Sequence, residues 1–155
     1  MPTNLGHYLV PEAVVLGMQA QNAEEVIHEL GTKLLNAGFV RDSFVEAVIA
    51  REKIIPTGLP LMGKYNAAIP HTDVEHVLTS GMAMATLKQP VAFHNMLTPE
   101  ETVDVRLVFI LALDRPGAQV KMLQGIAAVL QDPQLVSVLI DAQDLAQVRK
   151  AIDTV

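Results

Sequence analysis

The 155-residue sequence contains no cysteine and no tryptophan, and only 4% of its residues are aromatic. The missing thiols exclude disulfides, thiolate metal sites and a cysteine nucleophile within this chain. Charged residues are also sparse, at 18%, and 11 Lys and Arg face 17 Asp and Glu, which gives a net charge of −6 with the histidines neutral. Because binding to nucleic acid depends on clusters of Lys and Arg that neutralise phosphates, we expect no nucleic-acid partner.

Long apolar runs and targeting segments are missing as well. The longest apolar run, from Leu107 to Leu113, falls far short of the roughly 20 residues that span a bilayer. Residues 1–7 lack the basic and apolar regions of a signal peptide. We therefore expect a soluble protein, and the absence of cysteine fits a cytoplasmic location.

Half of the residues are hydrophobic, which is typical of a globular chain with a large core. No linker, repeat or low-complexity tract divides the sequence, so we predict one domain over residues 1–155. Strands are predicted at 13–18, 81–87 and 105–113. The third is almost continuously apolar, as in a central strand that is covered on both faces.

Capping residues mark the first two predicted helices. Asn22 predicts the start of a helix that Gly38 ends. Ser43, with Glu46 three residues later, predicts a capping box for a second helix, and Pro56 forces its end.

Three more helices are predicted after residue 117. Asp132 before Pro133 indicates the start of a short helix, and the last helix runs from about 143 to 152. The first of the three has apolar residues on one face at helical spacing: Val120, Leu123, Ile126, Ala127 and Leu130. This order of elements predicts an α/β fold in which helices cover both faces of a central sheet.

Histidines are the main candidates for chemistry in a chain without cysteine. His7, His28 and His94 occupy polar positions of the N-terminal segment, an amphipathic helix and a turn, so we interpret them as solvent-exposed. His71 and His76 are five residues apart, whereas a zinc-binding pair on a helix is spaced i and i+4. The sequence therefore offers no ligand set for a metal, and a metal hydrolase is disfavoured.

His71 has a distinctive setting, because it follows an apolar segment that ends in Pro70 and precedes Thr72 and Asp73. A side chain just past a strand end, on backbone restricted by proline, is presented to a substrate with little loss of conformational entropy. Neutral imidazole is a nucleophile near neutral pH, and its other nitrogen needs an acceptor that fixes the tautomer. Position alone leaves a structural role open.

Arg51 near the end of the second predicted helix is the other candidate. Its guanidinium suits phosphate or carboxylate oxygens, and the hydroxyls of Thr57 and Thr72 could add neutral donors. The alternative is a solvated charged turn at a helix C-terminus. No Walker A loop or dinucleotide fingerprint is present, so a nucleotide substrate is not supported.

Three short segments carry a resemblance to a known family: AREK at 50–53, PTGL at 56–59 and AIPHT at 68–72. In order and separation they resemble the signature of the IIA proteins of the fructose/mannitol class of the bacterial phosphoenolpyruvate:sugar phosphotransferase system. The resemblance extends over essentially the whole chain. It implies a central mixed β-sheet sandwiched by helices on both faces, and a phosphotransferase that needs no cofactor.

By this resemblance His71 accepts a phosphoryl group from the phosphohistidine of the HPr phosphocarrier protein and passes it to a cysteine of a IIB protein. The membrane IIC component is then a partner only indirectly. Arg51 is implied to lie beside the active histidine, where its charge stabilises the phosphoryl group. Thr57 and Thr72 are implied as secondary donors to the phosphoryl oxygens.

One position distinguishes subgroups of the family. Mannitol- and fructose-type members usually have a second active-site histidine where this chain has Gln119, which can donate a hydrogen bond but cannot carry charge. Galactitol-type members look similar in having glutamine there, so we predict a galactitol-like protein. The sugar itself stays open, because a IIA protein does not contact it.

The alternative function is a regulatory module of the nitrogen-related IIA type, whose phosphorylation state controls protein partners. A gene neighbourhood with IIB and IIC components would favour transport. Transfer between proteins needs a docking surface, so we expect a flat apolar patch around His71 rather than a deep cleft.

Overall fold

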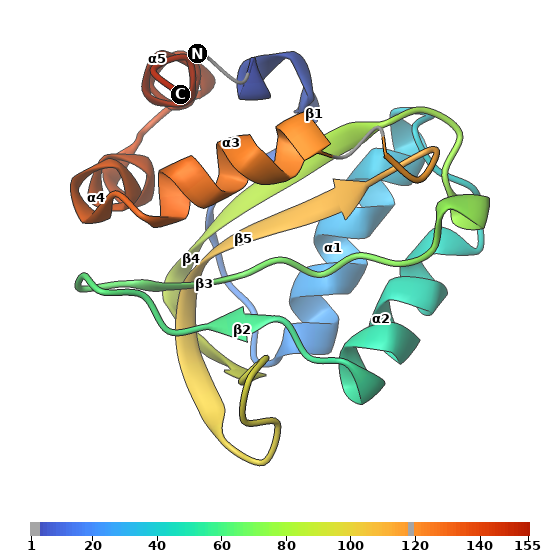
Figure 1. Cartoon of the computed structure of the whole chain (residues 1–155), viewed down its shortest axis with the longest axis horizontal. Helices are drawn as coiled ribbons and strands as arrows, with labels where there is room; N and C mark the ends of the chain where they lie inside the picture. The colour runs from blue at the N-terminus through green and yellow to red at the C-terminus, as the bar shows by residue number, and fades with distance from the viewer. Residues whose placement is uncertain (1–3, 118–119) are drawn as a thin grey trace.

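The computed structural model of the chain describes residues 4–117 and 120–155, and its centre is a β-sheet with the strand order β1-β4-β5-β3-β2 (Figure 1). The strands are β1 (Leu9–Met18), β2 (Gly58–Leu59), β3 (Asn66–Ala68), β4 (Gly81–His94) and β5 (Thr102–Ala112). β1 pairs with β4 and β3 with β5 in parallel, whereas β4 with β5 and β2 with β3 are antiparallel. The sheet is therefore mixed, as the resemblance implied.

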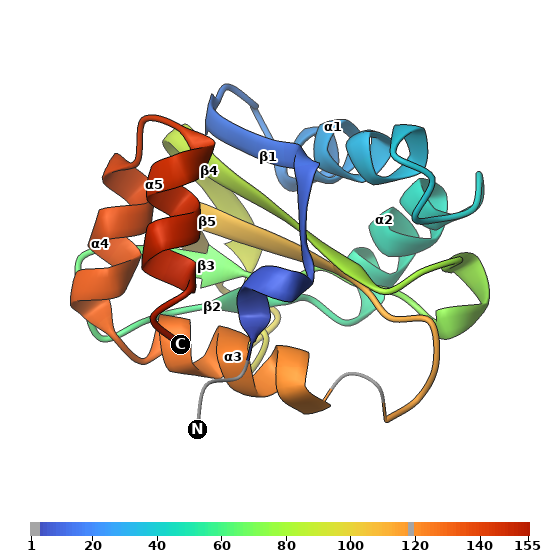
Figure 2. The same cartoon turned by 90° about the horizontal axis from the view of Figure 1, so that it is seen from above.

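Helices cover both faces of this sheet (Figure 2), which confirms the predicted fold class. One face carries α1 (Ala23–Asn36) and α2 (Phe44–Ile54), and the other carries α3 (Val120–Leu130), α4 (Pro133–Asp141) and α5 (Leu145–Ile152). Two short 3-10 helices, η1 (Leu5–His7) and η2 (Val74–His76), complete the elements. A separate hydrophobic cluster fills the space between the sheet and each helical layer.

The two central strands supply both clusters by alternation. Ala83 and Ala85 of β4 pack toward α1 and α2, whereas Met82 and Met84 pack toward α3, α4 and α5. This follows from the period of two in a strand, whose successive side chains point to opposite faces. The apolar run in β5 is buried in the same way, as its sequence predicted.

β4 and β5 are both longer than predicted. β4 continues past Leu87 to His94, β5 begins earlier, at Thr102, and the added residues form a hairpin with one solvent-exposed face. Residues 88–90 are exposed and include Pro90, which marks the end of a strand when the sequence is read alone. A shift of register between Thr86 and Val91 accommodates these residues. Pairing then resumes from Val91 to His94.

The short strand β2 approaches this hairpin closely. Gly58 bridges to Asn95, and the Met96 N–H donates to the Gly58 carbonyl at 2.8 Å. A Cβ at position 58 would lie 2.6 Å from the carbonyl oxygen of His94. Only glycine fits there, which is a structural reason for the glycine of the PTGL segment.

Of the two predicted helix caps, one is present in the structure and one is not. The Asn22 side chain accepts a hydrogen bond from the Glu25 N–H at 2.9 Å, which confirms the cap of α1. Ser43 precedes α2 but makes no side-chain cap, so the predicted capping box is wrong. Its hydroxyl instead forms a 2.8 Å hydrogen bond with Nδ1 of His76, because tertiary contact competes with the local cap.

The buried face of α3 also differs from the prediction. It consists of Met122, Gly125, Ile126 and Val129, whereas Val120 and Leu123 are exposed. The helix is apolar on almost all sides, so its spacing fits more than one face. Among the described residues no single helix is long and apolar enough to cross a membrane, and α3 with α4 meets that test only as a pair bent by 90°.

Candidate functional site

His71 lies on the segment that leaves β3 and continues beside β5. The Leu111 N–H donates to the Pro70 carbonyl at 3.1 Å, and His71 forms a single parallel bridge with Leu111. The backbone at the histidine is thereby tied to a central strand. This tie limits how far the imidazole can move relative to the core.

The imidazole of His71 is oriented by a hydrogen bond two residues back in the chain. Its Nδ1 lies 2.9 Å from the carbonyl oxygen of Ile69. A carbonyl can only accept, so this contact assigns the proton to Nδ1. In the neutral ring Nε2 then keeps its lone pair and is the nitrogen that is free to act as a nucleophile.

A surface depression of about 450 Å³ surrounds His71. Three polar residues line it beside the histidine, namely Arg51, Thr72 and Asp73. The rest of the lining is apolar: Ile69, Val74, Leu111, Leu113, Pro116 and Leu123. The expected apolar surface around His71 is therefore present, although it is hollowed rather than flat.

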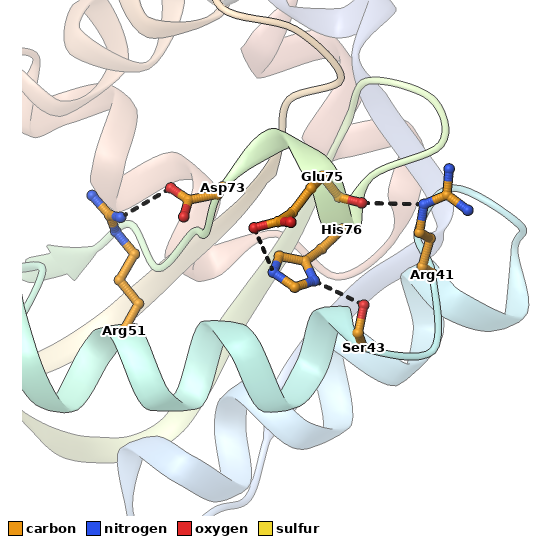
Figure 3. Close-up of polar contacts among 6 residues, drawn as sticks. All are labelled: Arg41, Ser43, Arg51, Asp73, Glu75 and His76. Atoms are coloured by element: carbon orange, nitrogen blue, oxygen red, sulfur yellow. Dashed lines mark hydrogen bonds and ion pairs between the residues drawn. The ribbon is translucent and has the colours of Figure 1, made fainter.

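Arg51 reaches this depression from the last turn of α2 and points toward Asp73 (Figure 3). Its Nη1 lies 3.4 Å from Oδ1 of Asp73, and the two side chains are 32% and 70% exposed. The Arg51 Nε is buried and has no hydrogen-bond partner among the residues that the structure describes. The guanidinium lines the same depression as His71, and its fork of donors is suited to bind an anion.

The segment after His71 is held against α2 by a second set of contacts (Figure 3). The Arg41 Nε donates to the Glu75 carbonyl at 3.1 Å, and Ser43 binds His76 as described above. Nε2 of His76 lies 3.8 Å from the Glu75 carboxylate. The contacts of Arg41 and Ser43, which precede α2, and the Arg51 and Asp73 pair hold residues 73–76 beside this helix.

Thr57 lies behind the depression rather than in it. It is 2% exposed, and its hydroxyl donates to Oε1 of Glu52 at 2.8 Å and accepts from the Ile69 N–H at 3.2 Å. Its backbone N–H donates to Oε2 of Glu52, also at 2.8 Å. The one hydroxyl proton of Thr57 is thus used inside the protein, whereas Thr72 lines the depression.

Glu52 was not singled out by the sequence, yet it is only 9% exposed. Burial raises the pKa of its carboxyl above the ordinary value of 4.5, while the hydrogen bonds from Thr57 and the charge of nearby His94 act in the opposite direction. In the sequence it stands between Arg51 and Lys53 at a helix end, a pattern typical of a solvated turn. Only its three-dimensional partners reveal that it points inward.

The remaining candidates from the sequence are three histidines and Gln119. His7, His28 and His94 are exposed, as interpreted, and Gln119 lies outside the described residues. Over residues 4–117 and 120–155 no three His, Asp or Glu side chains gather as a metal-binding group.

Residues 7–155 match the family model described as "Phosphoenolpyruvate-dependent sugar phosphotransferase system, EIIA 2". The galactitol-specific EIIA component of Escherichia coli K12 is 32% identical over 124 residues, which cover 80% of this chain and 81% of that protein. The mannitol-specific EIICBA component of Vibrio cholerae is 30% identical over 149 residues, or 94% of this chain and 22% of that longer protein. The Escherichia coli enzyme IIA for mannitol, solved in complex with phosphorylated enzyme IIB, matches with a TM-score of 0.78 at 27% identity, covering 95% of this chain and 98% of that chain.

Proposed function

The chain belongs to the EIIA 2 family of the phosphoenolpyruvate-dependent sugar phosphotransferase system, and from this premise we propose that it is a phosphocarrier acting through His71. It accepts a phosphoryl group from the phosphohistidine of HPr and transfers it to a cysteine of a IIB protein. The observation that carries the proposal is that Nδ1 of His71 faces the Ile69 carbonyl, which leaves Nε2 of the neutral ring free in a depression that Arg51 also lines.

Each transfer exchanges one bond to phosphorus for another. In the first step the Nε2 lone pair attacks phosphorus, a new N–P bond forms, and the N–P bond of the donor histidine breaks with its electron pair returning to that ring. In the second step a thiolate of the IIB protein attacks, an S–P bond forms, and the bond to Nε2 breaks. The proton on Nδ1 stays in its hydrogen bond to Ile69 throughout.

Arg51 is the charge partner of the phosphoryl group in this proposal. Such a group carries nearly two negative charges, and transfer depends mainly on positioning and on stabilising that charge. Among the described residues, the buried Nε of Arg51 has no partner, and its Nη1 is engaged only by the largely exposed Asp73. Thr72 adds a hydroxyl at the same depression.

The partners follow from the apolar rim and from the relatives. Leu113, Pro116 and Leu123 give the depression an apolar border, which suits docking of a folded protein. The galactitol-specific relative supports uptake of a galactitol-like sugar, and the mannitol IIA in complex with phosphorylated IIB supports a IIB acceptor. We place the protein in the cytoplasm, where HPr and IIB would meet it, with IIC reached only through IIB.

A labelling experiment tests the acceptor. Incubation with phosphoenolpyruvate, enzyme I and HPr should add one acid-labile phosphoryl group to the protein, and His71→Ala should add none. His76→Ala is the matched control, because it removes a part-buried imidazole from the same segment. Equal labelling of His71→Ala and the wild type would overturn the assignment of His71.

A second experiment distinguishes transport from the regulatory alternative. Phosphorylated protein is mixed with candidate IIB proteins, and the label is followed onto the acceptor cysteine. Rapid discharge to a IIB protein supports transport. Retention of the label in the presence of every IIB protein of the same cell would instead favour the regulatory module.

A further inference from the structure

We infer that Glu52 and Thr57 are positioning residues for His71, acting through the backbone of Ile69 on the tautomer of the imidazole. The inference rests on the proposed function, because it explains how the accepting nitrogen is kept free. Neither residue lines the depression around His71, so neither contacts the reacting atoms.

Four hydrogen bonds connect the two residues to His71, and two of them join Glu52 and Thr57 in parallel. Both carboxylate oxygens of Glu52 accept from Thr57, one from its N–H and one from its hydroxyl, each at 2.8 Å. The Thr57 hydroxyl accepts from the N–H of Ile69 at 3.2 Å. The carbonyl of Ile69 accepts from Nδ1 of His71 at 2.9 Å.

Each bond in this series has a direction that only one arrangement of protons satisfies. The carboxylate has no proton to give, so the Thr57 hydroxyl must donate to it and can offer only lone pairs to Ile69. The N–H of Ile69 therefore donates to the Thr57 hydroxyl, and the carbonyl of Ile69 accepts from His71. With Nδ1 donating to that carbonyl, Nε2 is the nitrogen that attacks phosphorus.

The placement of Glu52 indicates that this series serves more than packing. An ionisable side chain that is 9% exposed is costly to bury, and an apolar residue of similar size would fill the same space without that cost. Burial raises the pKa of this carboxyl, as expected for a charge withdrawn from water. A buried acceptor with two donors is what fixes the single orientation of the Thr57 hydroxyl.

The geometry of α2 makes the arrangement compact. Arg51 and Glu52 are consecutive in its last turn, and one reaches the depression while the other points into the protein. The same helical turn thus supplies a cation to the phosphoryl site and an anion to the support of the histidine. This gives the AREK and PTGL segments a joint role that neither segment reveals alone.

Substitutions at Thr57 test the inference. Thr57→Val keeps the shape but removes the hydroxyl, which leaves the Ile69 N–H without its acceptor. Thr57→Ser keeps the hydroxyl and should restore wild-type behaviour. The matched control is Thr86→Val, because Thr86 is also buried and its hydroxyl accepts a backbone N–H, from Gly17 at 2.9 Å, in another part of the sheet.

The first measurement is the tautomer of His71, read from imidazole nitrogen and carbon shifts in protein labelled with isotopic histidine. The wild type, Thr57→Ser and Thr86→Val should hold the proton on Nδ1, whereas Thr57→Val should shift population to the form protonated on Nε2. If the wild-type ring carries its proton on Nε2, the inference is overturned whether or not any variant folds. A wild-type tautomer in folded Thr57→Val would overturn it as well.

The second measurement is the rate of phosphorylation by phospho-HPr. Thr57→Val should lower the rate roughly tenfold or more, the usual effect of losing a residue that orients a functional histidine. KM for HPr and the circular dichroism spectrum should stay unchanged, since the docking surface and the fold are intact. An unchanged rate in Thr57→Val would refute the positioning role. Failure of the wild type to be phosphorylated on His71 would refute the proposed function instead, and the tautomer result separates the two.

Discussion

Replacing Arg51 with alanine isolates the charge that we assign to the phosphoryl group. Among the residues that the structure describes, the resting guanidinium has one ionic contact, the 3.4 Å approach of Nη1 to Asp73, and its buried Nε has no partner. The phosphoryl group is therefore expected to recruit at least one charged hydrogen bond that the resting state lacks. Such a bond contributes about 1.5–3 kcal/mol, so Arg51→Ala should slow transfer roughly 10- to 150-fold.

The same substitution should leave stability almost unchanged. Asp73 is 70% exposed, and a pair of this kind contributes at most about 1 kcal/mol to folding. The two effects are measured by rapid-quench transfer from phospho-HPr and by urea unfolding. Arg51→Lys is the companion variant, since it keeps the charge without the fork of donors and should fall between the wild type and Arg51→Ala. A transfer rate within twofold of wild type in Arg51→Ala would refute the reasoning.

Three further changes have defined outcomes. Asp73→Asn removes the carboxylate that competes for Arg51, so phosphorylation should accelerate by up to roughly fivefold; a slower rate in the same quench measurement would count against competition. Burial raises the pKa of Glu52 above 4.5, so this carboxyl keeps its proton to higher pH in the folded state than in the unfolded state. Stability should therefore fall as the pH rises from the unfolded-state pKa through the folded-state pKa. Glu52→Gln should flatten this fall in urea unfolding between about pH 4 and pH 8, and an unaltered pH profile would disprove the contribution. Leu123→Asp places a charge on the apolar rim of the depression and should raise KM for the IIB protein roughly tenfold without lowering the melting temperature; an unchanged KM would remove Leu123 from the docking surface.

The architecture could be predicted where local and tertiary forces agree. Asn22 caps α1, and the apolar run of β5 is central, because in both places the local pattern matches the final packing. The prediction failed where another part of the chain competes. Ser43 hydrogen-bonds His76 instead of capping its own helix, and β4 continues past residue 87, where the predicted strand ends, through a shift of register before Val91.

At the site, too, the sequence predicts some residues and misses the contacts of others. His71, Arg51 and Thr72 line one depression, and the sequence predicts all three as site residues. The sequence predicts the Thr57 hydroxyl as a donor to the phosphoryl group, but it does not reveal that this hydroxyl donates its proton to Glu52 instead. A glutamate at a charged helix end is usually solvated. Its hydrogen-bond partner Thr57 lies only five residues ahead, but no local pattern reveals that the chain turns back there to place both donors on the carboxylate.

The most direct test of the account is to identify the phosphorylated atom. Protein labelled with isotopic nitrogen in its histidines is phosphorylated through HPr, and the nitrogen coupled to phosphorus is identified by NMR. We predict one coupled nitrogen, Nε2 of His71, with Nδ1 still protonated. Coupling to Nδ1 of His71, or to a nitrogen of any other histidine, would contradict the account.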